Sequence, residues 1–324
     1  MRLQANIPMM YPDGPDKPPV CSSADVMAKY DPHKQLADFM RLSSRERRKG
    51  LAGSRSETAK SGPLHLYKYR SLDTNPSSIS KARAILVHDR IWAAAPVSLN
   101  DPRDMRFKLV FNQDVETRKR WAKENAHLLP RSSPAKRLLW QQQLARTIMT
   151  PEMEGGFKQV MEQTMGVFCA STDPRSRQLW AHYGGEHRGI CIQISPYEDE
   201  LFLVARQVIY GEKFPTLTVP TPAGASQEYY LHKSSDWTYE KEWRVVLPIN
   251  NCSITLRPPA IAAVILGARV DNTTVDAVLQ LQHERQQIGK PPFKIYQAGL
   301  DDEGFDIHIR CKNSAPVGQR VLKT

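Results

Sequence analysis

The chain has 324 residues, of which 40% are apolar, and carries a formal net charge of +11. That length suits one large domain with an appendage or two small domains, and the charge favours an anionic partner such as nucleic acid, a nucleotide or an acidic protein face. No apolar run approaches the roughly 18 residues of a membrane span, and the scattered cysteines form no Cys-x-x-Cys pair, which argues against a disulfide framework and a structural zinc site.

Residues 1–62 are expected to form a weakly ordered basic arm, because prolines come early and little apolar periodicity accompanies them. Lys and Arg outnumber Glu between Arg41 and Lys60. Such a run is either a solvated tail or a contact for nucleic acid or a partner protein. The first residues lack the apolar core of a secretory signal, so a cytoplasmic protein is expected. Residues 314–324 are expected to be a tail.

Residues 63–313 are expected to form one α+β domain. Helices are predicted at 79–88, 179–183 and 273–288, and a helical insertion at about 115–165. Strands are predicted at 64–70, 90–95, 107–111, 166–171, 189–194, 202–210, around 242, at 261–266, and near 295 and 307. The strands dominate without regular alternation with helices, which indicates a mixed, mainly antiparallel sheet.

The segment from Ser234 to Pro248 is typical of a turn followed by a strand, on which Glu240, Glu242 and Arg244 would share one face. Two carboxylates on one face repel each other and are costly to bury together. They either form ion pairs on an exposed strand or lie in a half-buried cleft beside the flanking tryptophans. In a cleft, Glu240 and Glu242 would be candidate catalytic residues.

A short helix carries Trp180, His182 and Tyr183, followed by two glycines that end it. The spacing to Glu186 and His187 does not fit the inverted zinc motif, so no metal site is predicted. The aromatic rings could stack on a flat ligand ring while His182 forms a hydrogen bond. The alternative is an ordinary amphipathic turn packed on the sheet.

Arg70 ends an aromatic strand just after Tyr69. Its guanidinium suits a pyrophosphate, although a strand-end arginine in solvent is the alternative. The run from Asn100 to Pro102 is most often a turn with an Asx hydrogen bond. No Gly-x-Gly-x-x-Gly or P-loop occurs, which argues against a Rossmann or kinase-type phosphate site.

Taken together and in order, several of these segments resemble the bacterial family catalogued as domain of unknown function 2971. The resemblance covers about residues 63–310. It rests on Leu66–Arg70, Ile91-Trp92, Leu99–Asp104, Trp180-x-His182-Tyr183 with Gly189, and Asp236–Arg244. The usual aromatic residue after Asn-Asp-Pro is Arg103 here. The family supplies no activity by itself.

A more distant similarity, to ADP-ribosyltransferases of the Arg-Ser-Glu class, implies an activity and the cofactor NAD. That class has an Arg on its first strand, a Ser on a central strand and a Glu-x-Glu near a later one, as do Arg70, Ser171 and Glu240–Glu242. The similarity implies that Glu242 stabilises the positive charge that develops on ribose when nicotinamide leaves. Glu240 would orient or deprotonate the acceptor. The central strand departs from the class, because it reads Cys-Ala-Ser rather than Ser-Thr-Ser.

The same similarity implies the cofactor-binding residues. Arg70, with Tyr69 beside it, would hold the pyrophosphate, and Ser171 would brace the catalytic acid. Tyr183 or Trp180 would stack on nicotinamide, and His182 would be a further cofactor-binding residue. A bacterial toxin, effector or phage-defence protein is therefore expected, acting on a protein or nucleic acid. Two alternatives remain open: a basic nucleic-acid-binding or interaction module without catalysis, and a metal-dependent nuclease that uses the acidic pair.

Overall fold

The structure is a computed structural model. It describes residues 62–312, apart from 74, 113, 125–132, most of 147–164, 200, 203–204, 220–227 and 248–249. The predicted arm, except for residue 62, and the predicted tail lie outside the described residues. So does part of the predicted helical insertion.

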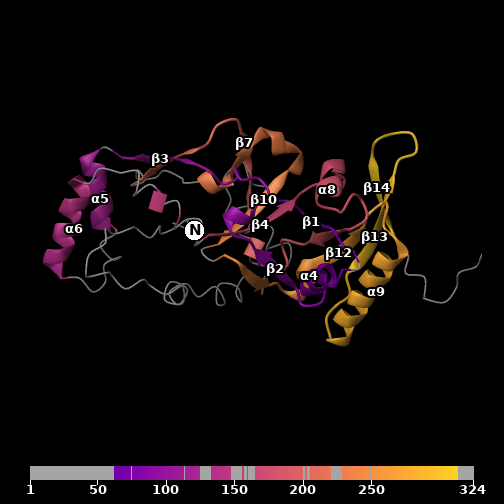
Figure 1. Cartoon of the computed structure of the whole chain (residues 1–324). Helices are drawn as coiled ribbons and strands as arrows, with labels where there is room; N and C mark the ends of the chain where they lie inside the picture. The colour runs from indigo at the N-terminus through magenta and orange to yellow at the C-terminus, as the bar shows by residue number, and fades with distance from the viewer. Residues whose placement is uncertain are drawn as a thin grey trace, which may run out of the picture.

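Eight strands form one sheet in the order β14-β13-β12-β5-β1-β4-β10-β6 (Figure 1). Their bounds are β1 Leu66–Arg70, β4 Gly166–Ser171, β5 Ile190–Ile194, β6 Arg206–Gln207, β10 Glu242–Leu247, β12 Ile261–Leu266, β13 Lys294–Leu300 and β14 Ile307–Cys311. Within this sheet, and among the residues that the structure describes, β12 and β13 pair in parallel and the other neighbours pair antiparallel. The prediction of an α+β fold with a mainly antiparallel sheet is therefore confirmed.

Three further strand pairs lie outside this sheet. They are β2 (Arg90–Ala93) with β11 (Cys252–Thr255), β3 (Lys108–Phe111) with β8 (Thr216–Val219), and β7 (Ile209–Gly211) with β9 (His232–Ser234). Short 3-10 helices connect several strands: η2 (Pro96–Ser98), η5 (Tyr229–Leu231), η6 (Ser235–Glu240) and η7 (Pro258–Ala260). Two of these elements, β9 and η6, carry part of the polar site described below.

The described helices are α4 (Pro76–Leu86), α5 (Val115–Glu124), α6 (Pro134–Arg146), α8 (Arg177–His182) and α9 (Asn272–Gln287). All five follow a residue whose side chain accepts a backbone hydrogen bond, as expected for residues that cap orphan amide groups. These residues are Asn75, Asp114, Ser133, Ser176 and Asp271. No described helix is long and apolar enough to cross a membrane.

The two faces of the sheet have different coverings (Figure 1). On the α4/α9 face, a large core packs Leu66, Phe168, Ile192 and Trp243 against Leu86 and Val278 of those helices. On the α8 face, a smaller cluster contains Tyr69, Leu179, Trp180, Cys191, Ile265 and Ile307. Because side chains alternate along a strand, neighbouring residues of β1 and β10 point to opposite faces.

Two predicted strands differ from the structure. The strand expected at 202–210 is two short strands, because β6 pairs with β10 whereas β7 pairs with β9. The strand expected around Glu240 begins only at Glu242. Ser234 caps η6 by accepting from the amide of Asp236, and Lys241 then adopts a left-handed conformation, with φ 44° and ψ 49°. Glu240 therefore ends a 3-10 helix and does not belong to the strand.

Candidate functional site

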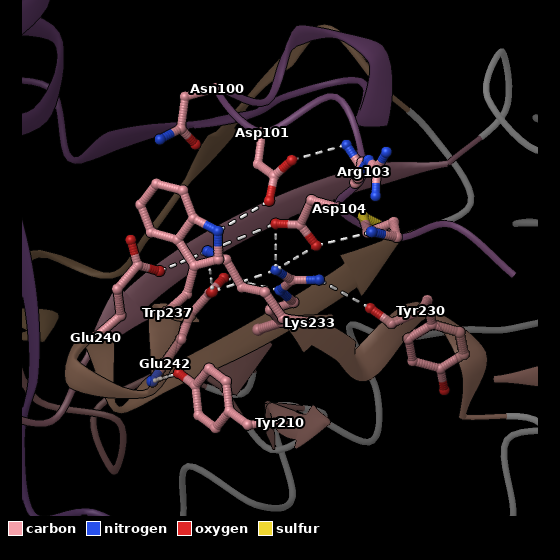
Figure 2. A network of polar contacts seen from close by, with 12 residues as sticks. Asn100, Asp101, Arg103, Asp104, Tyr210, Tyr230, Lys233, Trp237, Glu240 and Glu242 are labelled. Carbon is pink, nitrogen blue, oxygen red and sulfur yellow. Dashed lines mark hydrogen bonds and ion pairs between the residues drawn. The ribbon is translucent and has the colours of Figure 1, made fainter. Parts of the chain in front are cut away.

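Five charged side chains are buried together beside the start of β10 (Figure 2). Each is at most 7% exposed, although charged residues are rarely buried unless they are paired. They are Asp104 from the loop after η2, Lys233 from β9, Glu240 from η6, and Glu242 and Arg244 from β10. We call this group the charge cluster.

Lys233 lies among the three carboxylates. Its Nζ is 2.5 Å from Glu240 Oε2, 2.9 Å from Glu242 Oε2 and 3.5 Å from Asp104 Oδ2. The ammonium therefore occupies the position that a metal ion would need between these acids. Within the described ranges, no group of His, Cys, Asp and Glu could hold a metal ion. This arrangement argues against a nuclease that uses the acidic pair to bind a metal.

Arg244 is fully buried and joins the other side of the charge cluster. Its Nε donates to Glu242 Oε1 at 2.7 Å, and its Nη2 donates to both oxygens of Asp104 at 2.8 and 2.6 Å. Its Nη1 donates to the carbonyl oxygen of Tyr230 at 3.0 Å. Both oxygens of Glu242 are therefore bound by cations, so this carboxylate serves as a structural ion-pair partner.

The pKa values of the two glutamates are shifted in opposite directions. Burial alone would raise the pKa of Glu242, but the charges of Arg244 and Lys233 outweigh it and hold that pKa at about 2. Burial and the charge of Glu242 raise the pKa of Glu240 above its usual value, against the opposing effect of Lys233. With three carboxylates and two cations, Glu240 is the acid whose negative charge is least compensated.

Glu240 is also the acid that connects the charge cluster to the surface. Its Oε1 accepts a hydrogen bond from the Tyr183 hydroxyl at 2.9 Å, and that hydroxyl accepts one from Asn100 Nδ2 at 2.7 Å. Tyr183 is half-buried and Asn100 is exposed. A chain of polar groups therefore leads from solvent to the carboxylate.

Aromatic side chains surround this outer end. The rings of Trp237 and Tyr239 are 6.0 Å apart, and the exposed ring of His182 is 6.4 Å from Tyr239. Trp237 donates its indole N–H to Asp101 at 2.8 Å (Figure 2), and Lys233 lies 5.0 Å from its ring centroid. Half-buried rings beside a polar group suit a planar ligand.

Four of the predicted site residues therefore come together: Glu240, Glu242, His182 and Tyr183. The convergence expected for Arg70 is not found, because its side chain belongs to the opposite face of the sheet. In the register, Glu242 faces Ser171 and Ser171 faces Tyr67. Tyr67 packs on the α8 face, whereas Arg70 pairs with Ile190 of the α4/α9 core. Arg70 is also three residues further along β1, or about 10 Å.

Tyr69 and Trp180 are part of the core and do not line a ligand site. Trp180 is fully buried and Tyr69 is 7% exposed, with their rings edge to face at 5.1 Å. Their polar atoms donate to the carbonyl oxygens of Pro174 and Asp173. The expected stacking of Trp180 on nicotinamide is therefore not supported.

Ser171 lies directly across from Glu242, as the similarity implied, but makes no hydrogen bond to that carboxylate. Its hydroxyl accepts from the amide of Asp173 at 3.0 Å and so stabilises the turn after β4. Ser171 is buried between Glu242 and Tyr67, its neighbours on the two adjacent strands. Its role here is to shape the backbone.

Lys233, Asp104 and Asn100 belong to the site but were not among the predicted site residues. Asp101 does form the predicted Asx turn, through the amide of Arg103, while its other oxygen accepts from Trp237. One signal was available: two buried glutamates require cations, and Lys233 precedes them by a few residues. Nothing in the sequence indicated which loop would supply Asp104.

No family model, curated protein or solved structure matches this chain. Three of the segments singled out in the sequence contribute residues to the charge cluster and its surroundings. These are Leu99–Asp104, Trp180-x-His182-Tyr183 and Asp236–Arg244.

Proposed function

We propose that this protein is an enzyme that breaks the nicotinamide–ribose bond of NAD and transfers ADP-ribose to a protein or nucleic-acid acceptor. The observation that carries the proposal is the hydrogen bond from Tyr183 to Glu240. It joins a buried carboxylate of raised pKa to the hydroxyl of the half-buried Tyr183. Groups with perturbed pKa values at such positions are candidates for acid–base chemistry.

In this proposal Glu240 keeps the role that the similarity implied for it, deprotonation of the acceptor, and the charge cluster as a whole replaces Glu242 in stabilising the charge on ribose. Both oxygens of Glu242 are occupied by Lys233 and Arg244, so it positions Lys233 and does not contact substrate. Glu240 has one oxygen on Lys233 and the other on Tyr183. Only the second contact is with a group that reaches the surface.

The reaction can be written with its protons. An acceptor hydroxyl donates its proton to the Tyr183 oxygen while Tyr183 passes its own proton to Glu240. The acceptor oxygen attacks the ribose C1′, and the C1′–N bond breaks with its electron pair leaving on nicotinamide. The negative charge of the cluster stabilises the positive charge that builds on ribose. The rings of Trp237, Tyr239 and His182 provide the surface for the nicotinamide ring.

Two further observations support this reading. Ser171 and Glu242 lie opposite each other on neighbouring strands, which is the adjacency implied by the Arg-Ser-Glu similarity. The net charge of +11 also favours an anionic substrate. The departure is Arg70, which lies on the other face and leaves the pyrophosphate without its expected cation.

The test is incubation of the purified chain with labelled NAD and mixed cell extract, measuring nicotinamide release and label transfer. Wild type should be active and Glu240→Gln should lose activity by at least about a hundredfold, the usual size of an acid–base contribution. Glu116→Gln, at an exposed position on α5, is the matched control and should keep full activity. A wild type that releases no nicotinamide, or a folded Glu240→Gln that releases it normally, contradicts the proposal. Salt-sensitive RNA or DNA binding without nicotinamide release would instead favour the interaction module.

A further inference from the structure

A hollow of about 400 Å³ lies away from the charge cluster, between the loop after β4 and the β13–β14 hairpin. Its polar and aromatic lining consists of Arg175, Arg177, Phe305, Asp306 and His308. The volume falls within the range of roughly 300–1,000 Å³ typical of small-molecule sites. This hollow has no part in the chemistry described above.

We infer that this hollow binds the adenosine diphosphate part of a dinucleotide, with Arg175 and Arg177 on the phosphates and Phe305 against the adenine ring. The inference deepens the proposed function and rests on it for the connection to Glu240. The two arginines of the hollow supply the positive charge for the phosphates that Arg70 cannot provide from the other face of the sheet.

The hollow and the outer end of the charge cluster lie on the same face. Ile307 and Ile309 of the lining pack with Tyr183 and Tyr239 in the cluster of the α8 face. Helix α8 connects the two places, since Arg177 is its first residue and His182 its last. At 1.5 Å per residue, these positions are about 7.5 Å apart along the helix axis. Five residues also turn the helix by about 140°, so a ligand that contacts both residues has to bend around α8.

The charges of the hollow suit phosphate. Arg175 and Arg177 are both exposed and have no ion-pair partner among the residues that the structure describes. Arginine forks bind phosphate oxygens in pairs, and His308 stands beside them. The carboxylate of Asp306 repels a bare anion, and it can accept hydrogen bonds from ribose hydroxyls or an adenine amino group. The mixture therefore fits a nucleotide better than an inorganic ion.

Phe305 supplies the flat surface. Its side chain is 82% exposed even though the Arg177 guanidinium lies 5.3 Å from its ring centroid. The cation over the ring fixes Arg177 near the phosphate position, and most of the ring stays open to solvent. Stacking of a base on such a ring contributes roughly 1–3 kcal/mol in other nucleotide-binding proteins.

The experiment titrates the full chain with ADP, and separately with inorganic pyrophosphate, by calorimetry. Arg175→Ala and Arg177→Ala should each weaken ADP binding at least tenfold. Phe305→Ala should weaken ADP binding more than it weakens pyrophosphate binding, because it removes the surface for the base as well as the ring that holds Arg177. Arg188→Ala is the matched control, because it removes another exposed arginine outside the hollow, and it should bind ADP as wild type does. Unchanged thermal unfolding shows that each variant is folded.

The outcomes separate this inference from the proposed function. If wild type binds no ADP, or if both arginine variants bind it like wild type, the inference is overturned. Arginine-dependent ADP binding without nicotinamide release supports the hollow and contradicts the proposed reaction. Nicotinamide release that survives both arginine substitutions supports the reaction and overturns the role of the hollow.

Discussion

Arg70 and Glu242 project from opposite faces of one sheet. Leu66 and Arg70 share the α4/α9 face by alternation, whereas Glu242 lies in a row with Ser171 and Tyr67 on the α8 face. A single ligand cannot contact both side chains without passing through the sheet. In the proposed reaction, the site at Glu240 therefore works without Arg70.

The first prediction concerns that separation. Arg70→Ala should change nicotinamide release by no more than about twofold, because the substitution removes no transition-state contact. Arg177→Ala serves as the contrast and should lower the release at subsaturating NAD. The assay is initial-rate nicotinamide release at several NAD concentrations. A tenfold loss in folded Arg70→Ala would place the arginine in the reaction after all.

The second prediction concerns Lys233, which compensates three buried carboxylates. Lys233→Met should lower the free energy of unfolding by about 3–5 kcal/mol, since it leaves these charges buried with Arg244 as their remaining cation. Lys241→Met is the control: its ammonium pairs with Asp173 at the surface, and its loss should cost about 0–1 kcal/mol. Urea unfolding measures both. Adding Glu240→Gln to Lys233→Met should restore part of the lost unfolding free energy. If the effects of the two substitutions simply add, Lys233 and Glu240 are not energetically coupled.

The third prediction concerns acid. The pKa of Glu242 in the folded protein is about 2, against a usual 4.5. A depressed pKa means that the ionised carboxylate stabilises the fold above about pH 4.5 and that this stabilisation is lost as the pH falls toward 2. The pKa of Glu240 is raised, so its protonation on acidification favours the folded state and offsets part of the stability lost at Glu242. Urea unfolding between about pH 3 and pH 6 should show a shallower acid loss in Glu242→Gln than in wild type. If the unfolding free energy falls equally steeply with pH in both proteins, the lowered pKa of Glu242 is contradicted.

The fourth prediction concerns the hydroxyl of Tyr183. Its hydrogen bond stabilises the ionised form of Glu240 and so lowers the pKa of that carboxyl. Tyr183→Phe should therefore raise the pKa of Glu240 further. The acid limb of any remaining activity should move to higher pH, and the carboxyl carbon of Glu240 should titrate at higher pH by carbon-13 NMR. A carboxyl titration that does not move would show that the hydroxyl and carboxylate are not coupled.

The fifth prediction concerns the turn after α8. A Cβ at Gly267 would lie 2.1 Å from the carbonyl oxygen of His187, so the backbone of that turn would have to shift. Gly267→Ala should cost about 1–3 kcal/mol of unfolding free energy, as overpacking does. Gly211→Ala is the matched control, because nothing lies within 4 Å of its added Cβ. Chemical denaturation of both variants decides the point, and equal stabilities would refute the close packing.

Local sequence patterns predicted most of the sheet correctly. The strands at 166–171 and 261–266 were expected with the bounds that the structure shows, because continuous apolar runs of that length suit buried strands. The start of β10 was wrong, since alternation was extended through Glu240 and Lys241. The cap at Ser234 and the left-handed conformation of Lys241 make this segment a 3-10 helix. Neither feature can be recognised from the alternation of side chains along a strand.

The sequence by itself determined the class of fold and indicated the acidic pair Glu240 and Glu242, because both follow from residue type and local spacing. Only the tertiary structure decided which cations meet those acids. Asp104, Lys233 and Arg244 come from three separate segments, and their encounter depends on strand order and register. It also decided the position of Arg70, because a side chain's face depends on the pairing of its strand with neighbours distant in the chain.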